Sequence, residues 1–213
     1  MKSNVKTIGK FITIEGVEGV GKTTNIGHLK EFLDENKIHY IVTREPGGTL
    51  LGEKLRDLLL TVSDETLDAT AELLLVFAAR AQHLAKVIKP ALAAGTWVLC
   101  DRFTDATFAY QGAGRGIDLE SISALQSLVQ HELRPDLTLI LDLDPAVGME
   151  RAAKRAALDR FEQEQIEFFQ RVRAGYLRIA RSEPSRCAII NADQSLAGVK
   201  AELVQTVREK LRL

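Results

Sequence analysis

The segment Phe11–Thr24 contains residues of the type and spacing that bind a nucleoside triphosphate. An apolar run leads directly into GVEGVGKT, where four residues separate Gly16 from Gly21 and Lys22 and Thr23 follow. Glycines let backbone N–H groups turn inward around phosphate oxygens, where side chains would block them. Lys22 can compensate the charge of the β- and γ-phosphates, and the Thr23 hydroxyl can ligate Mg²⁺. We therefore predict ATP binding by a phosphate loop made of Gly16, Val17, Glu18, Gly19, Val20, Gly21, Lys22, Thr23 and Thr24.

Two later apolar runs end in a carboxylate that could hold the metal ion of a bound nucleotide, Asp101 and Asp142. Asp101 is the stronger candidate, because Arg102 follows it and puts a cation beside the phosphates. Asp142 could simply close its strand. Asp101 is therefore predicted to ligate Mg²⁺ together with Thr23. The chain has neither the N/T-K-x-D nor the D-x-x-G motif of GTPases, so a GTPase is not indicated.

A sheet must hold these residues, and five short apolar runs are predicted to be its strands. Helical patterns lie between the runs; the clearest, near the C-terminus, repeats Leu196, Val199 and Leu203 on one face. Alternating strands and helices predict βαβ units. We expect an α/β, three-layer P-loop NTPase fold, with helices on both faces of a five-stranded parallel sheet. The predicted strands are Phe11–Glu15, His39–Thr43, Thr96–Cys100, Leu137–Asp142 and Cys187–Asn191.

The composition fits a compact enzyme better than a nucleic-acid-binding or membrane protein. The 213 residues carry a formal net charge of −1, which argues against holding nucleic acid by phosphate contacts. The N-terminus lacks the apolar core of a signal peptide, and no apolar run is long enough to cross a bilayer. Cys100 and Cys187 are too few for a disulfide framework, as expected in a reducing compartment. The expected location is the cytoplasm.

Several short motifs follow one another along the chain. They are the phosphate loop, REPGGT at Arg44–Thr49, FAAR at Phe77–Arg80, DRF at Asp101–Phe103, AYQG at Ala109–Gly112, RPDL at Arg134–Leu137 and RAALDRFE at Arg155–Glu162. In this order they resemble bacterial thymidylate kinases over nearly the whole chain. The resemblance implies one kinase domain over residues 1–213 that uses ATP and Mg²⁺ to phosphorylate dTMP to dTDP, a step toward dTTP. ATP and dTMP are the implied partners.

Phosphoryl transfer to a nucleoside monophosphate needs little covalent help from a protein. The acceptor phosphate oxygen is already a nucleophile, so the protein must hold two anions in line and neutralise the developing charge. This requirement predicts cations around the phosphate loop. The resemblance places Arg56 and Arg102 on the acceptor phosphate and Glu18 at the 3′-hydroxyl of its sugar. It also places Pro46, in the REPGGT motif, among the substrate-binding residues.

The phosphate loop has no arginine between its first and last glycine. Family members without a loop arginine have a basic lid instead, and the resemblance implies such a lid at about residues 150–162. Arg155 best matches the lid position. Catalytic roles are thus implied for Lys22, Arg102 and Arg155. The other cations of this region are Arg151, Lys154 and Arg160.

Thymine presents a flat apolar face, carbonyl oxygens and an N3–H donor, so its recognition requires stacking and a few hydrogen bonds. Arg80 is the candidate donor to a carbonyl of the base. Thr107 and Gln111 are both candidates near N3. The Tyr110 ring could crowd the 2′ position and favour a deoxyribose. All four residues are therefore predicted to bind the substrate.

The stacking residue departs from the family pattern. Family members usually have a phenylalanine four residues before the base-binding arginine, but here Val76 occupies that position and Phe77 follows it. Either spacing stays on one face of a helix. Phe77 is predicted to stack on the base, and the sequence leaves open whether Val76 faces it instead.

A predicted helix over residues 66–94, bent or ended near Pro90, contains the segment Leu73–Phe77, which is apolar on every side. A sheet can cover only one side, so a lone molecule would expose an apolar patch unless another helix of the chain covers it. We therefore expect a two-fold homodimer through residues 66–94, as the resemblance also implies.

Two other functions stay open. One is a kinase for a different acceptor, such as a deoxynucleoside. The other is a regulatory P-loop ATPase whose output is a protein contact. A regulatory ATPase would hydrolyse ATP at a rate that does not respond to nucleotide acceptors.

Overall fold

The computed structural model describes residues 8–154 and 159–213. In this part, five strands form one parallel sheet in the order β2-β3-β1-β4-β5. The strands are β1 (Phe11–Glu15), β2 (Tyr40–Arg44), β3 (Trp97–Asp101), β4 (Leu137–Asp142) and β5 (Cys187–Asn191). Three of them occupy the predicted ranges. β2 and β3 each lie one residue further along, because Tyr40 pairs with Trp97 and Arg44 with Asp101.

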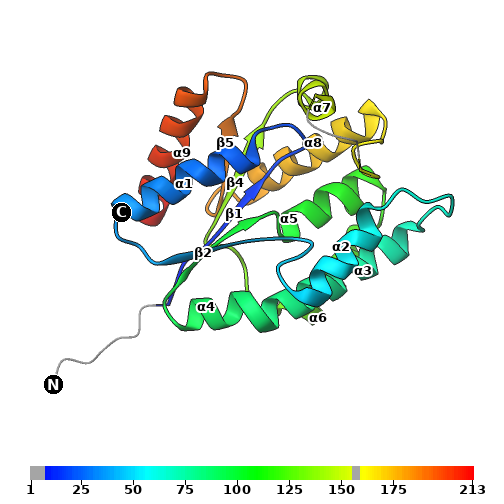
Figure 1. The fold of residues 1–213 in the computed structure, drawn as a ribbon, viewed down its shortest axis with the longest axis horizontal. Coiled ribbons are helices and arrows are strands. Elements are labelled where there is room, and N and C mark those ends of the chain that lie inside the picture. The colour runs from blue at the N-terminus through cyan, green and yellow to red at the C-terminus, as the bar shows by residue number, and fades with distance from the viewer. Residues whose placement is uncertain (1–7, 155–158) are drawn as a thin grey trace.

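Helices cover both faces of this sheet (Figure 1). They are α1 (Lys22–Glu35), α2 (Leu50–Leu60), α3 (Ala69–His83), α4 (Lys89–Ala93), α5 (Thr104–Thr107), α6 (Leu119–Gln130), α7 (Pro145–Ala153), α8 (Ile166–Ser182) and α9 (Leu196–Leu211), with π-helical segments η1 (Leu84–Ile88) and η2 (Phe108–Gly114). Side chains alternate between faces along β3. Leu99 belongs to the same core cluster as Leu29 of α1. Its neighbours Val98 and Cys100 pack with Ile88 of η1. The predicted three-layer α/β fold is confirmed.

The helical region predicted over residues 66–94 consists of three pieces. α3 begins at Ala69, and the Asp68 carboxylate accepts a hydrogen bond of 2.8 Å from the Thr70 backbone N–H, which caps the helix. The α-helix ends at His83, continues as η1, and gives way to α4, which has Pro90 in its first turn. Pro90 has no N–H to donate to a carbonyl of the preceding turn, so it interrupts the regular hydrogen-bond pattern of the helix. The regular helix therefore ends before Pro90.

The apolar segment of α3 is largely covered by the same chain. Leu73 and Phe77 are each 2% exposed and pack with Ile122 of α6. Leu74, in contrast, is 51% exposed. The expectation of a wide uncovered face is therefore wrong for Leu73 and Phe77, because α2 and α6 pack against α3. Within residues 8–154 and 159–213, no helix has both the length and the hydropathy needed to span a bilayer.

Candidate active site

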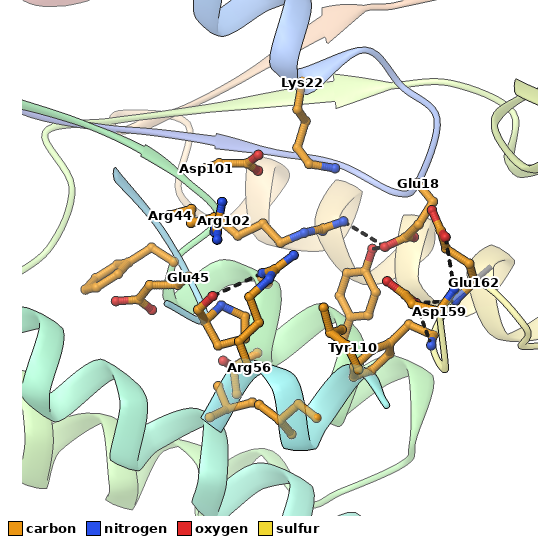
Figure 2. Close-up of a pocket in the computed structure, with 18 of the residues that line it drawn as sticks. Glu18, Lys22, Arg44, Glu45, Arg56, Asp101, Arg102, Tyr110, Asp159 and Glu162 are labelled. Carbon is orange, nitrogen blue, oxygen red and sulfur yellow. Dashed lines mark hydrogen bonds and ion pairs between the residues drawn. The ribbon is translucent and has the colours of Figure 1, made fainter. Parts of the chain in front are cut away.

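A pocket of about 280 Å³ lies at the carboxyl ends of β2, β3 and β1 (Figure 2). Parallel strands bring these ends to one edge of the sheet, where ligands bind in open α/β folds. The walls are formed by the phosphate loop, the segment after β2, and parts of α2, α3 and η2. Asp159, Phe161 and Glu162 complete them. Most of the predicted site residues line it: Glu18, Gly19, Gly21, Lys22, Thr23, Thr24, Pro46, Arg56, Arg80, Asp101, Arg102, Thr107, Tyr110 and Gln111.

The loop between β1 and α1 has a backbone that few residues other than glycine adopt. Gly16 and Gly19 have φ values of 137° and 72°. A Cβ atom on Gly19 would lie 1.9 Å from the carbonyl oxygen of Gly148 in α7, so only glycine fits there. Val17 and Val20 are 2% and 3% exposed and belong to the core. Only the backbone of these two valines can therefore face a ligand.

Lys22 points from α1 into the pocket (Figure 2). Its Nζ donates to the carbonyl oxygens of Gly16 and Val17 at 3.3 and 3.2 Å, which is long for a charged hydrogen bond. Burial, and then the positive charge of Arg102, lower the pKa of Lys22 from 10.5 to about 8. Phosphate oxygens would compensate this ammonium group better than the two carbonyls do.

Glu18, the acidic residue of the phosphate loop, contacts Arg102 and Tyr110. Arg102 Nη2 donates to Glu18 Oε1 at 2.8 Å, and the Tyr110 hydroxyl lies 2.8 and 2.7 Å from the two carboxylate oxygens (Figure 2). Burial opposes the charge on Arg102, but Tyr110 and Glu18 raise its pKa well above the usual value. These contacts offset a negative charge that would otherwise repel phosphate.

The buried carboxyl group of Glu15 lies behind Arg102. Its oxygens accept hydrogen bonds from the Phe103 backbone N–H at 2.7 Å and from the Tyr176 hydroxyl at 2.8 Å. Tyr176 in turn accepts from Arg102 Nη1 at 3.3 Å. Burial, and then the charge of Asp105, raise the pKa of Glu15 from 4.5 to about 8. Sequence reasoning missed this support of Arg102, because Glu15 reads simply as the end of a strand.

Three arginines line one side of the pocket. Arg56 Nη1 donates to the carbonyl oxygen of Pro46 at 3.0 Å, and Arg44 pairs with Glu53 at 2.7 Å. Burial, and then the positive charges of Arg44 and Arg102, lower the pKa of Arg56. An anion bound among these guanidinium groups would relieve their mutual repulsion. This side of the pocket therefore suits a phosphate group.

Asp101 and Thr23 both line the pocket and offer the hard oxygen ligands that Mg²⁺ prefers. Asp101 Oδ1 is buried and has no hydrogen-bond partner among the described residues. Asp142 instead forms a two-point ion pair with Arg173 at 2.6 and 2.9 Å. The described residues contain no cluster of three or more His, Cys, Asp or Glu side chains able to hold a metal ion alone. Asp101 fits a metal bound jointly with substrate phosphates better than Asp142 does.

Arg80 also lines the pocket and is 1% exposed. Its Nε donates to Glu45 Oε2 at 2.7 Å, and its Nη2 donates to the Phe103 carbonyl oxygen and to Thr107 Oγ1 at 3.1 and 3.0 Å. His83 also holds Glu45, at 2.9 Å. Nη1 is buried and lacks a partner within the described part of the chain. A buried N–H group without an acceptor is costly, which indicates a ligand acceptor at this place.

Phe77, predicted to stack on the base, does not line the pocket, and Val76 does. The Phe77 ring packs with Leu73 and lies 4.9 Å from the Arg80 guanidinium carbon. Val76 is one helical turn before Arg80 and faces the same side, whereas Phe77 is rotated by about 100°. The prediction that Phe77 faces the base is therefore wrong by one residue: Val76 is the residue of this pair that faces the pocket.

The predicted lid is only partly within the described residues, and its candidate catalytic residue, Arg155, lies outside them. Arg160 donates to Glu72 Oε2 and to the Leu59 carbonyl oxygen, both at 2.7 Å. Lys154 pairs with Glu150 at 2.6 Å. Neither Arg160 nor Lys154 lines the pocket, nor does Arg151. None of the described lid cations thus reaches the pocket wall.

Several pocket residues were not predicted as site residues. Phe161 packs edge-on against the Tyr110 ring at 5.9 Å between centroids. It belongs to the RAALDRFE motif, and Arg44 and Glu45 belong to REPGGT, so both motifs carried a signal. Phe103 likewise belongs to DRF, whereas Leu59, Leu60 and Ala106 have no such signal, because only the fold brings them to the pocket. The residues missed are Arg44, Glu45, Leu59, Leu60, Phe103, Ala106, Asp159, Phe161 and Glu162.

The sheet is parallel, and one pocket contains both a glycine phosphate loop with Lys22 and a second group of cations. These features define a P-loop phosphotransferase. The sequence profile described as thymidylate kinase matches residues 14–203. A thymidylate kinase of Teredinibacter turnerae is 60% identical over 195 residues, covering 92% of this chain and 95% of that protein. One of Pseudomonas syringae pv. tomato is 57% identical over 205 residues, covering 96% and 98%. The crystal structure of thymidylate kinase from Ehrlichia chaffeensis superposes with a TM-score of 0.76 at 38% identity, covering 93% of this chain and 98% of that one. This chain belongs to the thymidylate kinase family.

Proposed function

We propose that this protein transfers the γ-phosphoryl group of ATP to dTMP, giving ADP and dTDP on the route to dTTP. The observation that carries the proposal is that a single pocket joins the phosphate loop to a second set of cations, Arg56 and Arg102. Two anionic substrates need such a pair of sites. The family to which the chain belongs supports dTMP as the acceptor.

The chain's own residues supply position and charge. Lys22 and the loop N–H groups bind the donor phosphates, while Arg102 and Arg56 hold the acceptor phosphate in line with them. The Glu18 carboxylate faces the acceptor sugar and fixes Arg102 at 2.8 Å. A phosphate oxygen of dTMP attacks the γ-phosphorus as the bond to the β-phosphate oxygen breaks, so ADP leaves with that oxygen. No side chain needs to remove a proton, because the acceptor is already ionised.

Thr23 and Asp101 would hold Mg²⁺ together with phosphate oxygens of ATP. The buried Oδ1 of Asp101, which has no partner among the residues the structure describes, supports this assignment. When bound, the ion neutralises charge on the β- and γ-phosphates. The fit rests on oxygen ligands from two different elements, the end of β3 and the start of α1.

Arg80 and Gln111 would read the thymine edge. The buried Nη1 of Arg80, without a partner in residues 8–154 and 159–213, suits a carbonyl oxygen of the base. Thr107 already accepts a hydrogen bond from Arg80 Nη2, so Gln111 is the better candidate for N3. Val76 and Phe161 provide apolar surface beside the base.

The segment from about residue 150 to 162 would act as a lid within a single kinase domain. Asp159, Phe161 and Glu162 support this proposal because they already form part of the pocket wall. Closure over both substrates would exclude water, which competes as acceptor. Hydrogen exchange of residues 159–162 should slow when dTMP and a non-hydrolysable ATP analogue bind together. Exchange that ignores both ligands would contradict the lid.

A homodimer through α2, α3 and α6 is also part of the proposal. These helices pack side by side, and each has an exposed leucine: Leu58 at 63%, Leu74 at 51% and Leu128 at 71%. Leu74→Asp should shift the protein toward monomer in sedimentation at micromolar concentration. Leu196→Asp, at a leucine of α9 that is 66% exposed, is the control and should leave the dimer intact. A wild-type protein of monomer mass would rule the dimer out.

An assay of ADP release against a panel of acceptors tests the proposed reaction. ATP turnover should depend on dTMP and be much slower with thymidine, dCMP, dGMP or no acceptor. Fast turnover with thymidine would favour a deoxynucleoside kinase instead. Turnover that ignores every acceptor would favour a regulatory ATPase. Lys22→Ala run in parallel identifies any contaminating activity.

A further inference from the structure

A buried carboxylate lies directly behind the base end of the pocket. Glu72 of α3 is 0% exposed and is not part of the pocket wall. Its Oε1 accepts a hydrogen bond of 2.8 Å from Nε2 of Gln111, a pocket residue that is itself 3% exposed. The contact joins residues 39 positions apart in the chain. Among the described residues, Gln111 is the pocket residue to which Glu72 is hydrogen-bonded.

Two arginines form ion pairs with Glu72. Arg160 Nη2 donates to Oε2 at 2.7 Å, and Arg115 Nη2 approaches the same oxygen at 3.3 Å. An ionised carboxylate accepts hydrogen bonds and donates none. The side-chain amide of Gln111 must therefore turn its NH₂ group toward Glu72. Among the described residues, no hydrogen bond reaches Gln111 Oε1, the other end of the amide.

We propose that Glu72 is a specificity-determining positioning residue: it fixes the amide of Gln111 so that Oε1 is the acceptor offered to the base. The inference rests on the proposed function, in which Gln111 meets the N3 edge. A carboxamide left free could rotate by 180° and present either an acceptor or a donor. Glu72 removes that choice. The pocket then accepts a base with an N3–H donor.

This fixed orientation separates two kinds of pyrimidine. Thymine and uracil have a donor at N3 and an acceptor at O4, whereas cytosine has an acceptor at N3 and a donor amino group at C4. Gln111 Oε1 and Arg80 Nη1 together present an acceptor and a donor. This pair matches thymine and uracil. With cytosine, the Gln111 oxygen would face an acceptor at N3 and the Arg80 N–H would face a donor at C4. A buried mismatch of this kind is much more costly than a missing contact.

The test compares dUMP with dCMP as acceptors, because they differ only at C4 and N3. In Glu72→Gln, the arginines at the Oε2 position would bind the new amide oxygen, so the new NH₂ group would face Gln111. The side-chain amide of Gln111 would then rotate by 180° and offer its NH₂ group to the base. The ratio of kcat/KM for dUMP to that for dCMP should fall at least tenfold, mainly through a higher KM for dUMP. Glu164→Gln is the control: Glu164 is the other partner of Arg115, and its loss should leave the ratio unchanged.

Further variants separate this inference from the proposed function and from simple loss of stability. Gln111→Met removes the amide, so an unchanged ratio in this variant would refute the base contact itself. The double variant with Glu72→Gln should match Gln111→Met, because Glu72 acts through Gln111. A merely structural Glu72 would lower activity with both acceptors equally and keep the ratio.

Glu72→Asp covers the case in which Glu72→Gln does not fold. It retains the charge that Arg115 and Arg160 need but withdraws the carboxylate from Gln111 by one methylene, so the ratio should again fall. A folded Glu72 variant that keeps the wild-type ratio, while Gln111→Met loses it, would overturn the inference alone.

Discussion

The carboxylate of Glu18 and the guanidinium of Arg102 lie 2.8 Å apart, which joins the phosphate loop to the end of β3. The two residues are 84 positions apart in the chain. The pair is mostly buried, with side-chain exposures of 12% and 17%. Glu18 of the phosphate loop thus orients Arg102, a cation of the proposed acceptor site. The loop's negative charge is offset before either substrate arrives.

Glu18→Ala should therefore affect the two substrates differently. We expect kcat/KM for dTMP to fall about 10- to 100-fold, because Arg102 loses a charged hydrogen bond of about 1.5–3 kcal/mol. ATP affinity should stay the same or rise, since a negative charge leaves the loop. Glu53→Ala, which removes the exposed partner of Arg44, should change both values by about twofold or less. Equal losses for ATP and dTMP would contradict the assigned role.

Lys22→Ala should abolish phosphoryl transfer and leave the fold intact. In the proposed role the ammonium group compensates charge that is present only with bound phosphates. Within the described part of the chain its hydrogen bonds go to two carbonyl oxygens. Removing one neutral hydrogen-bond donor from such a site already costs about 10²–10³ in kcat, and Lys22 also carries a full charge. Circular dichroism and thermal melting should match those of the wild type. An activity within tenfold of the wild type would refute the role of Lys22.

ATP affinity should depend on pH through Lys22. The free protein has a pKa of about 8 at this residue, and bound phosphates must raise it, so binding takes up a proton above pH 8. Affinity should be nearly constant below about pH 8 and then fall by up to tenfold per pH unit. Lys22→Gln is neutral at every pH and should bind weakly with no such slope. Titration calorimetry from pH 7 to 9.5 in buffers of different ionisation enthalpy would measure the proton uptake directly.

Arg80→Ala should weaken dTMP binding more than it affects turnover. Its buried Nη1 is the proposed donor to the base, and charged hydrogen bonds contribute about 1.5–3 kcal/mol, so KM for dTMP should rise about 10- to 100-fold. The melting temperature should also fall, because Glu45 loses one of its buried partners. An unchanged KM for dTMP would contradict the assignment of Arg80 to the base.

Local patterns in the sequence were enough to predict the sheet and the phosphate loop. β1, β4 and β5 are apolar runs with clear ends, and the glycine spacing of the loop specifies its backbone directly. The stacking residue could not be predicted in the same way. Val76 and Phe77 differ by one helical step, and the packing of Phe77 with Ile122 of α6 decides which faces the pocket.

Buried ion pairs between distant segments were the least predictable part of the site. Glu45 meets Arg80 across 35 positions, and Glu72 meets Arg160 across 88. Neither carboxylate belongs to a local pattern that indicates its partner. The packing of α6 over Leu73 could not be predicted for the same reason, since helix packing depends on the fold and not on periodicity alone.

The fate of the γ-phosphoryl group tests the central claim most directly. ATP labelled in its γ-phosphate is incubated with the protein, Mg²⁺ and dTMP, and the products are separated by chromatography. The account predicts that the label appears in dTDP in equal amount to the ADP formed, and that Lys22→Ala forms neither. Label recovered as inorganic phosphate, with dTMP unchanged, would contradict it.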